Sequence, residues 1–186
     1  MDTGLLVVRL IVGLTLAGHG AQKLLGWFDG PGLRATTRHF EQLGYRPGMV
    51  FAVAAGLAEA LGGVLLAMGL LTPLAAAALV VVMVEAAVSA HLRNGFWLAK
   101  DGIEYAVVLG GVAAGLAFTG SGRDGVDALL GWHLNGTWWG ELAVALALAT
   151  SIAIEVYRRQ LWGHPQPHVQ PASSRASAVE SPHGTH

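Results

Sequence analysis

Long apolar runs are the feature that most limits what this chain can fold into. Five stretches approach the roughly 20 apolar residues that a helix needs to cross a bilayer. They cover about residues 4–25, 48–70, 73–92, 103–119 and 138–157. Only 12% of the residues are charged, against about 25% in soluble domains. The sequence therefore predicts an all-α integral membrane helical bundle in contact with the lipid bilayer, with a four-helix core and a fifth transmembrane helix.

The segments between these runs divide the chain into three parts. The loop 26–47 contains LRATTRHFEQLGY, which predicts a short amphipathic interfacial helix that ends at Gly44. Residues 71–73 leave room only for a tight hairpin between the second and third helices. The expected parts are a membrane core over 1–127, a linker and C-terminal transmembrane helix over 128–162, and a Pro-, Ser- and His-rich disordered tail over 163–186.

Charge and cysteine content exclude several classes of function. A net charge of -1 and scattered arginines argue against a nucleic-acid partner. Because the chain has no cysteine, it has no thiolate metal site and no thiol relay. No short histidine or carboxylate spacing typical of metal ligands occurs, so we expect no metal. Any redox chemistry must therefore depend on a bound cofactor or a partner.

Lysine and arginine are distributed unevenly between the two ends of the predicted helices. One end and the tail hold nine of them, and the other end holds only Arg9 and Arg123. The nine are Lys23, Arg34, Arg38, Arg46, Arg93, Lys100, Arg158, Arg159 and Arg175. By the positive-inside rule, the N-terminus is expected outside a bacterial inner membrane and the C-terminal tail in the cytoplasm.

Two charges lie inside the predicted helices, Arg9 in the first and Glu59 in the second. A charge near the bilayer centre costs about 2.5–3.5 kcal/mol on insertion scales, so neither should face lipid. One interpretation is a buried charge pair between Arg9 and Glu59 that holds the two helices in register. The other is that Glu59 is a proton-active or ligand-contacting carboxylate. Small residues one turn from Glu59 permit either a close helix contact or a cavity.

Polar side chains gather near the predicted cytoplasmic ends of four helices. The set includes His19, Gln22, Lys23, Glu85, His91, Glu104 and Tyr105, with Trp97 in the adjoining loop. His19 and Lys23 lie one helical turn apart on one face. They can serve the membrane interface, where Lys23 reaches headgroups, or form a site for an anionic or carbonyl-bearing ligand.

Four stretches, in order, resemble the DoxX family of small helical membrane proteins. They are HGAQKLLGWF after an arginine-bearing first helix, the glutamate in GLAEALGGVLLAMGLLTP, then HLRNGFW and EYAVVL. The resemblance covers about residues 4–127 and implies a four-helix core, so that the segment 138–157 and the tail extend beyond it. Members are associated with membrane redox assemblies and the quinone pool, which implies a redox-linked inner-membrane protein with quinone as its small partner.

The expected function is therefore a quinone-interacting subunit of a membrane oxidoreductase assembly, whether or not the chain is itself catalytic. The residues expected around the quinone headgroup are His19, Gln22, Lys23, His91, Trp97 and Glu104. Two alternatives remain. One is a noncatalytic anchor that recruits a soluble oxidoreductase through the basic cytoplasmic loops, and the other is a proton-coupled small-molecule carrier that uses Glu59. The sequence is compatible with both a monomer and a homo-oligomer.

Overall fold

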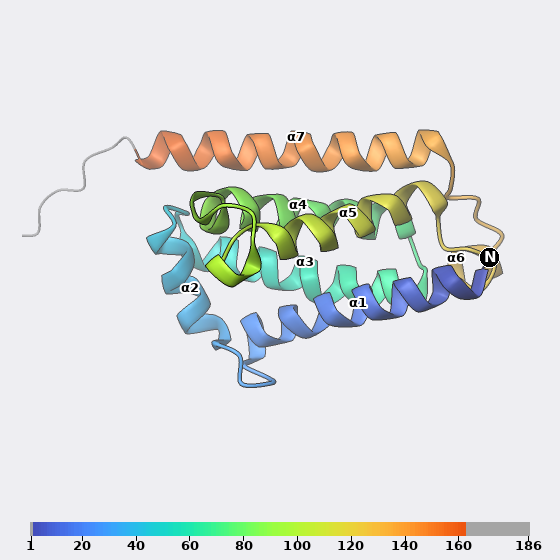
Figure 1. Ribbon diagram of the computed structural model, residues 1–186, viewed down its shortest axis with the longest axis horizontal. Helices are drawn as coiled ribbons and strands as arrows, with labels where there is room; N and C mark the ends of the chain where they lie inside the picture. The colour runs from blue at the N-terminus through green and yellow to red at the C-terminus, as the bar shows by residue number, and fades with distance from the viewer. Residues whose placement is uncertain (1, 163–186) are drawn as a thin grey trace, which may run out of the picture.

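The computed structural model describes residues 2–162, which form a bundle of helices that alternate in direction (Figure 1). The elements are α1 (Asp2–Leu25), α2 (Gly32–Gln42), α3 (Gly48–Met68), α4 (Thr72–Ala86), η1 (Ala87–His91), η2 (Leu92–Asn94), η3 (Leu98–Lys100), α5 (Glu104–Thr119), α6 (Val126–Leu129) and α7 (Thr137–Trp162). Every predicted apolar segment is helical, which confirms the all-α membrane bundle. The tail predicted to be disordered, 163–186, lies outside the described residues.

Helix length separates four membrane-spanning candidates from a shorter fifth helix. Within residues 2–162, four helical stretches are long and apolar enough to cross a bilayer, namely Thr3–Leu25, Gly48–Met68, Thr72–Asn94 and Thr137–Gln160. The apolar helix α5 has 16 residues, or about 24 Å at a rise of 1.5 Å per residue, against a hydrocarbon core of roughly 30 Å. The chain is thus a multi-pass membrane protein, and α5 is the short member of its bundle.

Helices α1 and α3 approach each other through glycine. A Cβ atom on Gly13 would lie 2.5 Å from the carbonyl oxygen of Gly63, and one on Gly20 would lie 2.6 Å from that of Gly56. Such distances leave no room for a side chain, so the two backbones touch directly. The small face predicted around Glu59 therefore serves, in part, for close helix packing. The same contacts fix the register of the two helices.

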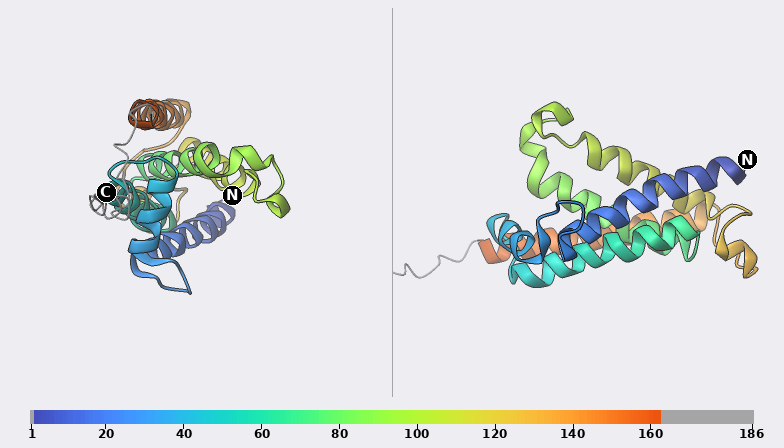
Figure 2. Two further views of the ribbon diagram at one scale, coloured as in Figure 1. Left: turned by 90° about the vertical axis from the view of Figure 1, so that its left-hand side faces the viewer. Right: turned by 90° about the horizontal axis from the view of Figure 1, so that it is seen from below.

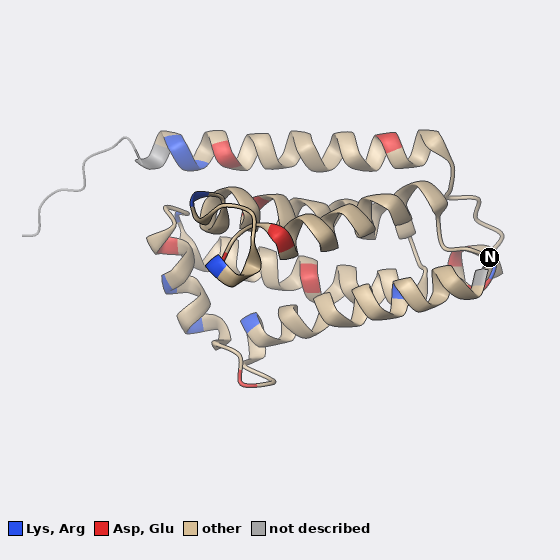
Figure 3. Ribbon diagram, viewed as in Figure 1, with Lys and Arg blue, Asp and Glu red and all other residues tan. Residues whose placement is uncertain are grey.

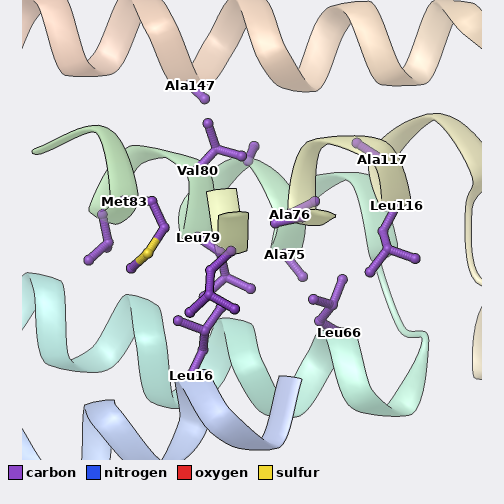
Figure 4. Close-up of a cluster of buried hydrophobic side chains, with 14 of the residues drawn as sticks. Leu16, Leu66, Ala75, Ala76, Leu79, Val80, Met83, Leu116, Ala117 and Ala147 are labelled. Atoms are coloured by element: carbon purple, nitrogen blue, oxygen red, sulfur yellow. The ribbon is translucent and has the colours of Figure 1, made fainter. Parts of the chain in front are cut away.

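Helix α4 lies at the centre of the bundle. It packs against α3, α5 and α7, while α1 packs mainly on α3 (Figures 1 and 2). Its buried face meets apolar side chains from every neighbour, as Figure 4 shows. The labelled members of this cluster are Leu16, Leu66, Ala75, Ala76, Leu79, Val80, Met83, Leu116, Ala117 and Ala147. Small and large side chains alternate here, which allows α4 to be surrounded closely on three sides.

The hairpin between α3 and α4 is as tight as its sequence predicts. Gly69 ends α3 in the left-handed region at φ 67°, and Leu71 also has a positive φ of 49°. Leu71 cannot cap α4 with its side chain, so Asp127 of α6 does so. The Asp127 carboxylate accepts hydrogen bonds from the Leu71 and Thr72 amides, at 2.7 and 3.0 Å, and from the Thr72 hydroxyl at 2.8 Å. A buried carboxylate thereby satisfies the free amides at the start of α4.

The short helix α2 covers the opposite end of the bundle. It occupies most of the segment predicted to be amphipathic, and Gly44 follows it with a φ of 91°. The next residue, Tyr45, is buried, and its hydroxyl donates a 2.8 Å hydrogen bond to Oε2 of Glu85. Lys and Arg lie mainly at this end of the bundle (Figure 3). The site residues expected from the sequence lie at the same end.

Candidate functional site

A cavity of about 190 Å³ lies between α1, α3, α5 and the end of α4. Five polar residues line it: His19 and Lys23 from α1, Glu59 from α3, His91 from η1 and Tyr105 from α5. Met83, Ala86, Leu98, Gly102 and Ala106 complete the wall. Three of the six residues expected around a headgroup, namely His19, Lys23 and His91, therefore share one cavity. The polar groups converge from four parts of the chain that are far apart in sequence.

Lys23 and Glu59 form an ion pair in the cavity wall. Nζ of Lys23 lies 2.5 Å from Oε1 of Glu59. The Glu59 side chain is only 2% exposed, whereas 27% of the Lys23 side chain is exposed. The second carboxylate oxygen, Oε2, is buried and has no hydrogen-bond partner among the described residues. A buried acceptor without a partner is costly, so this oxygen is an unexplained polar group in a residue of the cavity wall.

His19, one turn before Lys23 on α1, belongs to a hydrogen-bonded chain in the cavity wall. Nε2 of Gln22 donates to the Phe28 carbonyl at 3.3 Å, so Oε1 of Gln22 faces His19. Because that oxygen can only accept, Nδ1 of His19 donates to it at 2.9 Å. In the neutral ring, Nε2 then accepts from the Tyr105 hydroxyl at 2.7 Å. Gln22 is thus not part of the cavity wall and instead sets the orientation of the His19 ring.

A π-helical turn brings His91 to the cavity. Helix α4 ends at Ala86, and the following five residues, Ala87–His91, form the π-turn η1. A π-turn contains an extra residue relative to an α-turn, so it rotates the side chains that follow it. Nδ1 of His91 lies 2.9 Å from the Asp101 carbonyl oxygen, and therefore donates to it. This bond ties the ring to the loop that precedes α5.

Glu104 and Trp97 do not line the cavity. Glu104 is the first residue of α5, and its Oε2 accepts a hydrogen bond from the Leu98 amide at 2.8 Å. It therefore organises the loop before α5. Trp97 lies in that loop and is 63% exposed. Neither residue is placed to contact a ligand in the cavity.

The predicted charge pair between Arg9 and Glu59 is wrong. Glu59 pairs with Lys23, whereas Arg9 is fully buried next to Gly69 and Gly125. Glu59 and Gly69 are ten residues apart on α3 and its cap, which is about 15 Å along the helix. The glycine contacts between α1 and α3 set this register. The long Lys23 side chain reaches inward to Glu59 from the end of α1.

Two cavity residues were not among those expected around a headgroup, namely Glu59 and Tyr105. Both are polar residues on predicted membrane helices, so their residue types pointed to a site. Tyr105 belongs to the polar set expected at this end of the bundle, as its neighbour Glu104 does. A carboxylate in the first turn of a helix commonly accepts hydrogen bonds from free backbone amides, and that pattern could have assigned Glu104 to the loop.

Comparison with known proteins agrees with the fold. The DoxX family model matches residues 4–92. No curated protein and no solved structure matches the chain. The matched stretch runs from the first turn of α1 to just past η1 and contains four of the five polar cavity residues; Tyr105 lies beyond it. The chain is therefore a multi-pass, all-helical membrane protein whose residues 4–92 match the DoxX family model.

Proposed function

We propose that this protein is a redox-linked inner-membrane protein that binds the ring of a quinone in the cavity beside Lys23 and Glu59. One observation carries the proposal. A buried carboxylate oxygen, Oε2 of Glu59, lacks a partner in the wall of a polar cavity inside a membrane bundle. An intramembrane ionisable group in such a position is a functional-site candidate. The association of DoxX proteins with redox assemblies supports quinone as the occupant.

The cavity offers both types of group that a quinone needs. An oxidised ring has carbonyl oxygens, which accept hydrogen bonds, and the Lys23 ammonium has donors beyond the one used on Glu59. A reduced ring has hydroxyl groups, which can donate to Oε2 of Glu59. One pair of residues can therefore contact either redox form.

Cavity size limits the part of the ligand that enters. The volume of about 190 Å³ is below the roughly 300–1,000 Å³ of pockets that bury drug-sized ligands. It suits one ring and not a larger cofactor. His19 and Tyr105, already hydrogen-bonded to each other, also line the cavity and can exchange a proton with the ring.

A binding measurement tests this proposal. The full chain in detergent is titrated with a chain-free methylnaphthoquinone, in its oxidised and reduced forms, and binding is followed by calorimetry. His19→Ala and Lys23→Ala should each weaken binding by about tenfold, the equivalent of one lost polar contact. His133→Ala and Lys100→Ala are matched controls, because both residues are exposed and neither lines the cavity. Binding that is unchanged in both cavity variants, with folding intact, would refute the proposal.

A second candidate function follows from the distribution of charge. Lys and Arg lie mainly at the end of the bundle that carries α2 (Figure 3), and they could recruit a soluble oxidoreductase there. In this noncatalytic anchor, Lys23 and Glu59 would only stabilise the bundle. Reversing the charge of Arg34 and Arg38, both exposed on α2, separates the two functions. An anchor loses its partner, whereas a quinone site keeps its affinity.

A further inference from the structure

A second and larger cavity lies between α3, α4 and α7. Its volume is about 540 Å³. Helix α7 packs on α4 and α5, so its inner face and the neighbouring face of α3 form the two sides of a groove with α4 as its floor. Residues at helical spacing line each side, such as Ala54 and Ala58 on α3 and Leu146 and Thr150 on α7. Several of these side chains are exposed, so the groove opens laterally toward the bilayer.

The groove is long, narrow and apolar. On α4 and η1 its lining runs from Leu74 to His91, a distance of about 25 Å. Most of the lining is alanine, valine, leucine or isoleucine, and the polar side chains lie mostly at the end near α2. A length of this order, combined with the modest volume, suits a single hydrocarbon chain.

The groove adjoins the polar cavity at that same end. Lys23, Ala86 and His91 line both spaces. A ligand whose ring lies in the polar cavity would therefore find the apolar groove directly beside it. From there the groove leads along α4 toward Leu74, away from the end that carries α2.

The charges around the groove argue against a phospholipid headgroup. The Arg158 guanidinium lies over the ring of Tyr45, which lines the groove, but it makes two 2.8 Å hydrogen bonds to Glu155 and one of 2.7 Å to the Leu43 carbonyl. The Tyr45 hydroxyl is bonded to Glu85, whose carboxylate would repel a phosphate. An uncharged hydrocarbon chain meets neither obstacle.

We propose that the groove between α3, α4 and α7 binds the isoprenoid chain of the quinone whose ring occupies the polar cavity. The inference rests on the proposed quinone function and adds to it the part of the ligand that gives affinity. The ring binds in the polar cavity and the chain in the adjoining apolar groove, so the chain buries additional apolar surface without entering the polar cavity. A prenylated quinone binds more tightly than its chain-free ring for this reason.

The experiment compares two ligands with one ring, a chain-free methylnaphthoquinone and the same ring with a prenyl chain. The double variant Ala54→Phe/Ala78→Phe fills the groove from α3 and α4. Ala145→Phe/Ala149→Phe is the matched control, because both alanines are exposed on α7 and lie outside the groove. The groove variant should lose about tenfold in affinity for the prenylated ligand, equivalent to about two methylene groups no longer buried. Its affinity for the chain-free ring should stay that of the wild type.

The other outcomes separate the groove from the quinone function. If the groove variant binds both ligands like the wild type, the groove inference is overturned and the quinone site stands. Equal losses for both ligands also overturn it, because the groove would then act through the polar cavity. Loss of a copurified phospholipid without any change in quinone affinity identifies a bilayer lipid as the occupant. If the wild type binds neither ligand, the proposed function itself fails.

Discussion

Replacing Lys23 with methionine should destabilise the bundle more than replacing its partner Glu59 with glutamine. The two residues differ in burial, since the Glu59 side chain is 2% exposed and that of Lys23 is 27% exposed. Without Lys23, a carboxylate remains unpaired in the interior. Without Glu59, the lysine can turn toward solvent or headgroups.

The burial difference sets the expected free energies of unfolding. Removing one partner of a buried ion pair typically costs about 3–5 kcal/mol in soluble cores. Because Lys23 is partly exposed, we expect about 3 kcal/mol for Lys23→Met, at the low end of that range. For Glu59→Gln we expect about 1 kcal/mol, the scale of one neutral hydrogen bond. The double variant leaves no unpaired charge, so it should be more stable than Lys23→Met alone. The double-mutant cycle should therefore give a coupling free energy between Lys23 and Glu59 of about 1–2 kcal/mol.

Unfolding in mixed detergent micelles, followed by helicity, measures these differences. Lys100→Met and Glu141→Gln are matched controls at exposed positions and should stay within about 0.5 kcal/mol of the wild type. A double variant as unstable as Lys23→Met alone would show that the pair makes no net contribution. Equal losses for the two single variants would refute the argument from burial.

Three further predictions concern packing, topology and pH. Gly63→Val should destabilise the α1–α3 contact by about 1–3 kcal/mol or more, because a Cβ there lies 2.5 Å from the Ala17 amide nitrogen; Gly111→Val, with nothing within 4 Å, is its control in the same melting assay. A cysteine at position 173 of the tail should react in intact cells only with membrane-permeant thiol reagents. Labelling by an impermeant reagent would contradict the predicted cytoplasmic location of the tail. Burial, together with the hydrogen bond to Glu85, raises the pKa of Tyr45 well above its usual range. An unfolded tyrosine ionises near pH 10, so the folded state loses stability as pH rises above about 10. Melting experiments below and above about pH 10 should show a smaller loss of stability in Tyr45→Phe than in the wild type. An equal loss in both proteins would contradict the assignment to Tyr45.

The helices could be predicted from the sequence because the bilayer imposes a minimum length on apolar runs. The hairpin at residues 71–73 and the turn at Gly44 follow equally from local chemistry. Local patterns of this kind depend only on neighbours in the chain. They required no knowledge of how the helices pack.

The site was harder to predict because it depends on register between helices. Depth along each helix suggested Arg9 as the partner of Glu59, but the glycine contacts of α1 with α3 align Lys23 instead. The π-turn before His91 has no simple signature in its residues, AVSAH, yet it changes the direction of every side chain after it. Residue types therefore indicated the polar end of the bundle, and packing decided which side chains meet there.

Arg9 has a consequence for how the protein is made. Its guanidinium is buried against Gly69 and Gly125, with no hydrogen-bond partner among residues 2–162, and Asp124 and Asp127 are the acids close enough to act on its charge. The farthest of these neighbours, Asp127, follows Arg9 by 118 residues, which at about 5–20 residues per second take on the order of ten seconds to synthesise. During that time the first helix carries an arginine whose final surroundings do not yet exist. The Arg9 charge must therefore stay near the water interface or in contact with the insertion machinery while α1 inserts, until the last third of the chain has been synthesised.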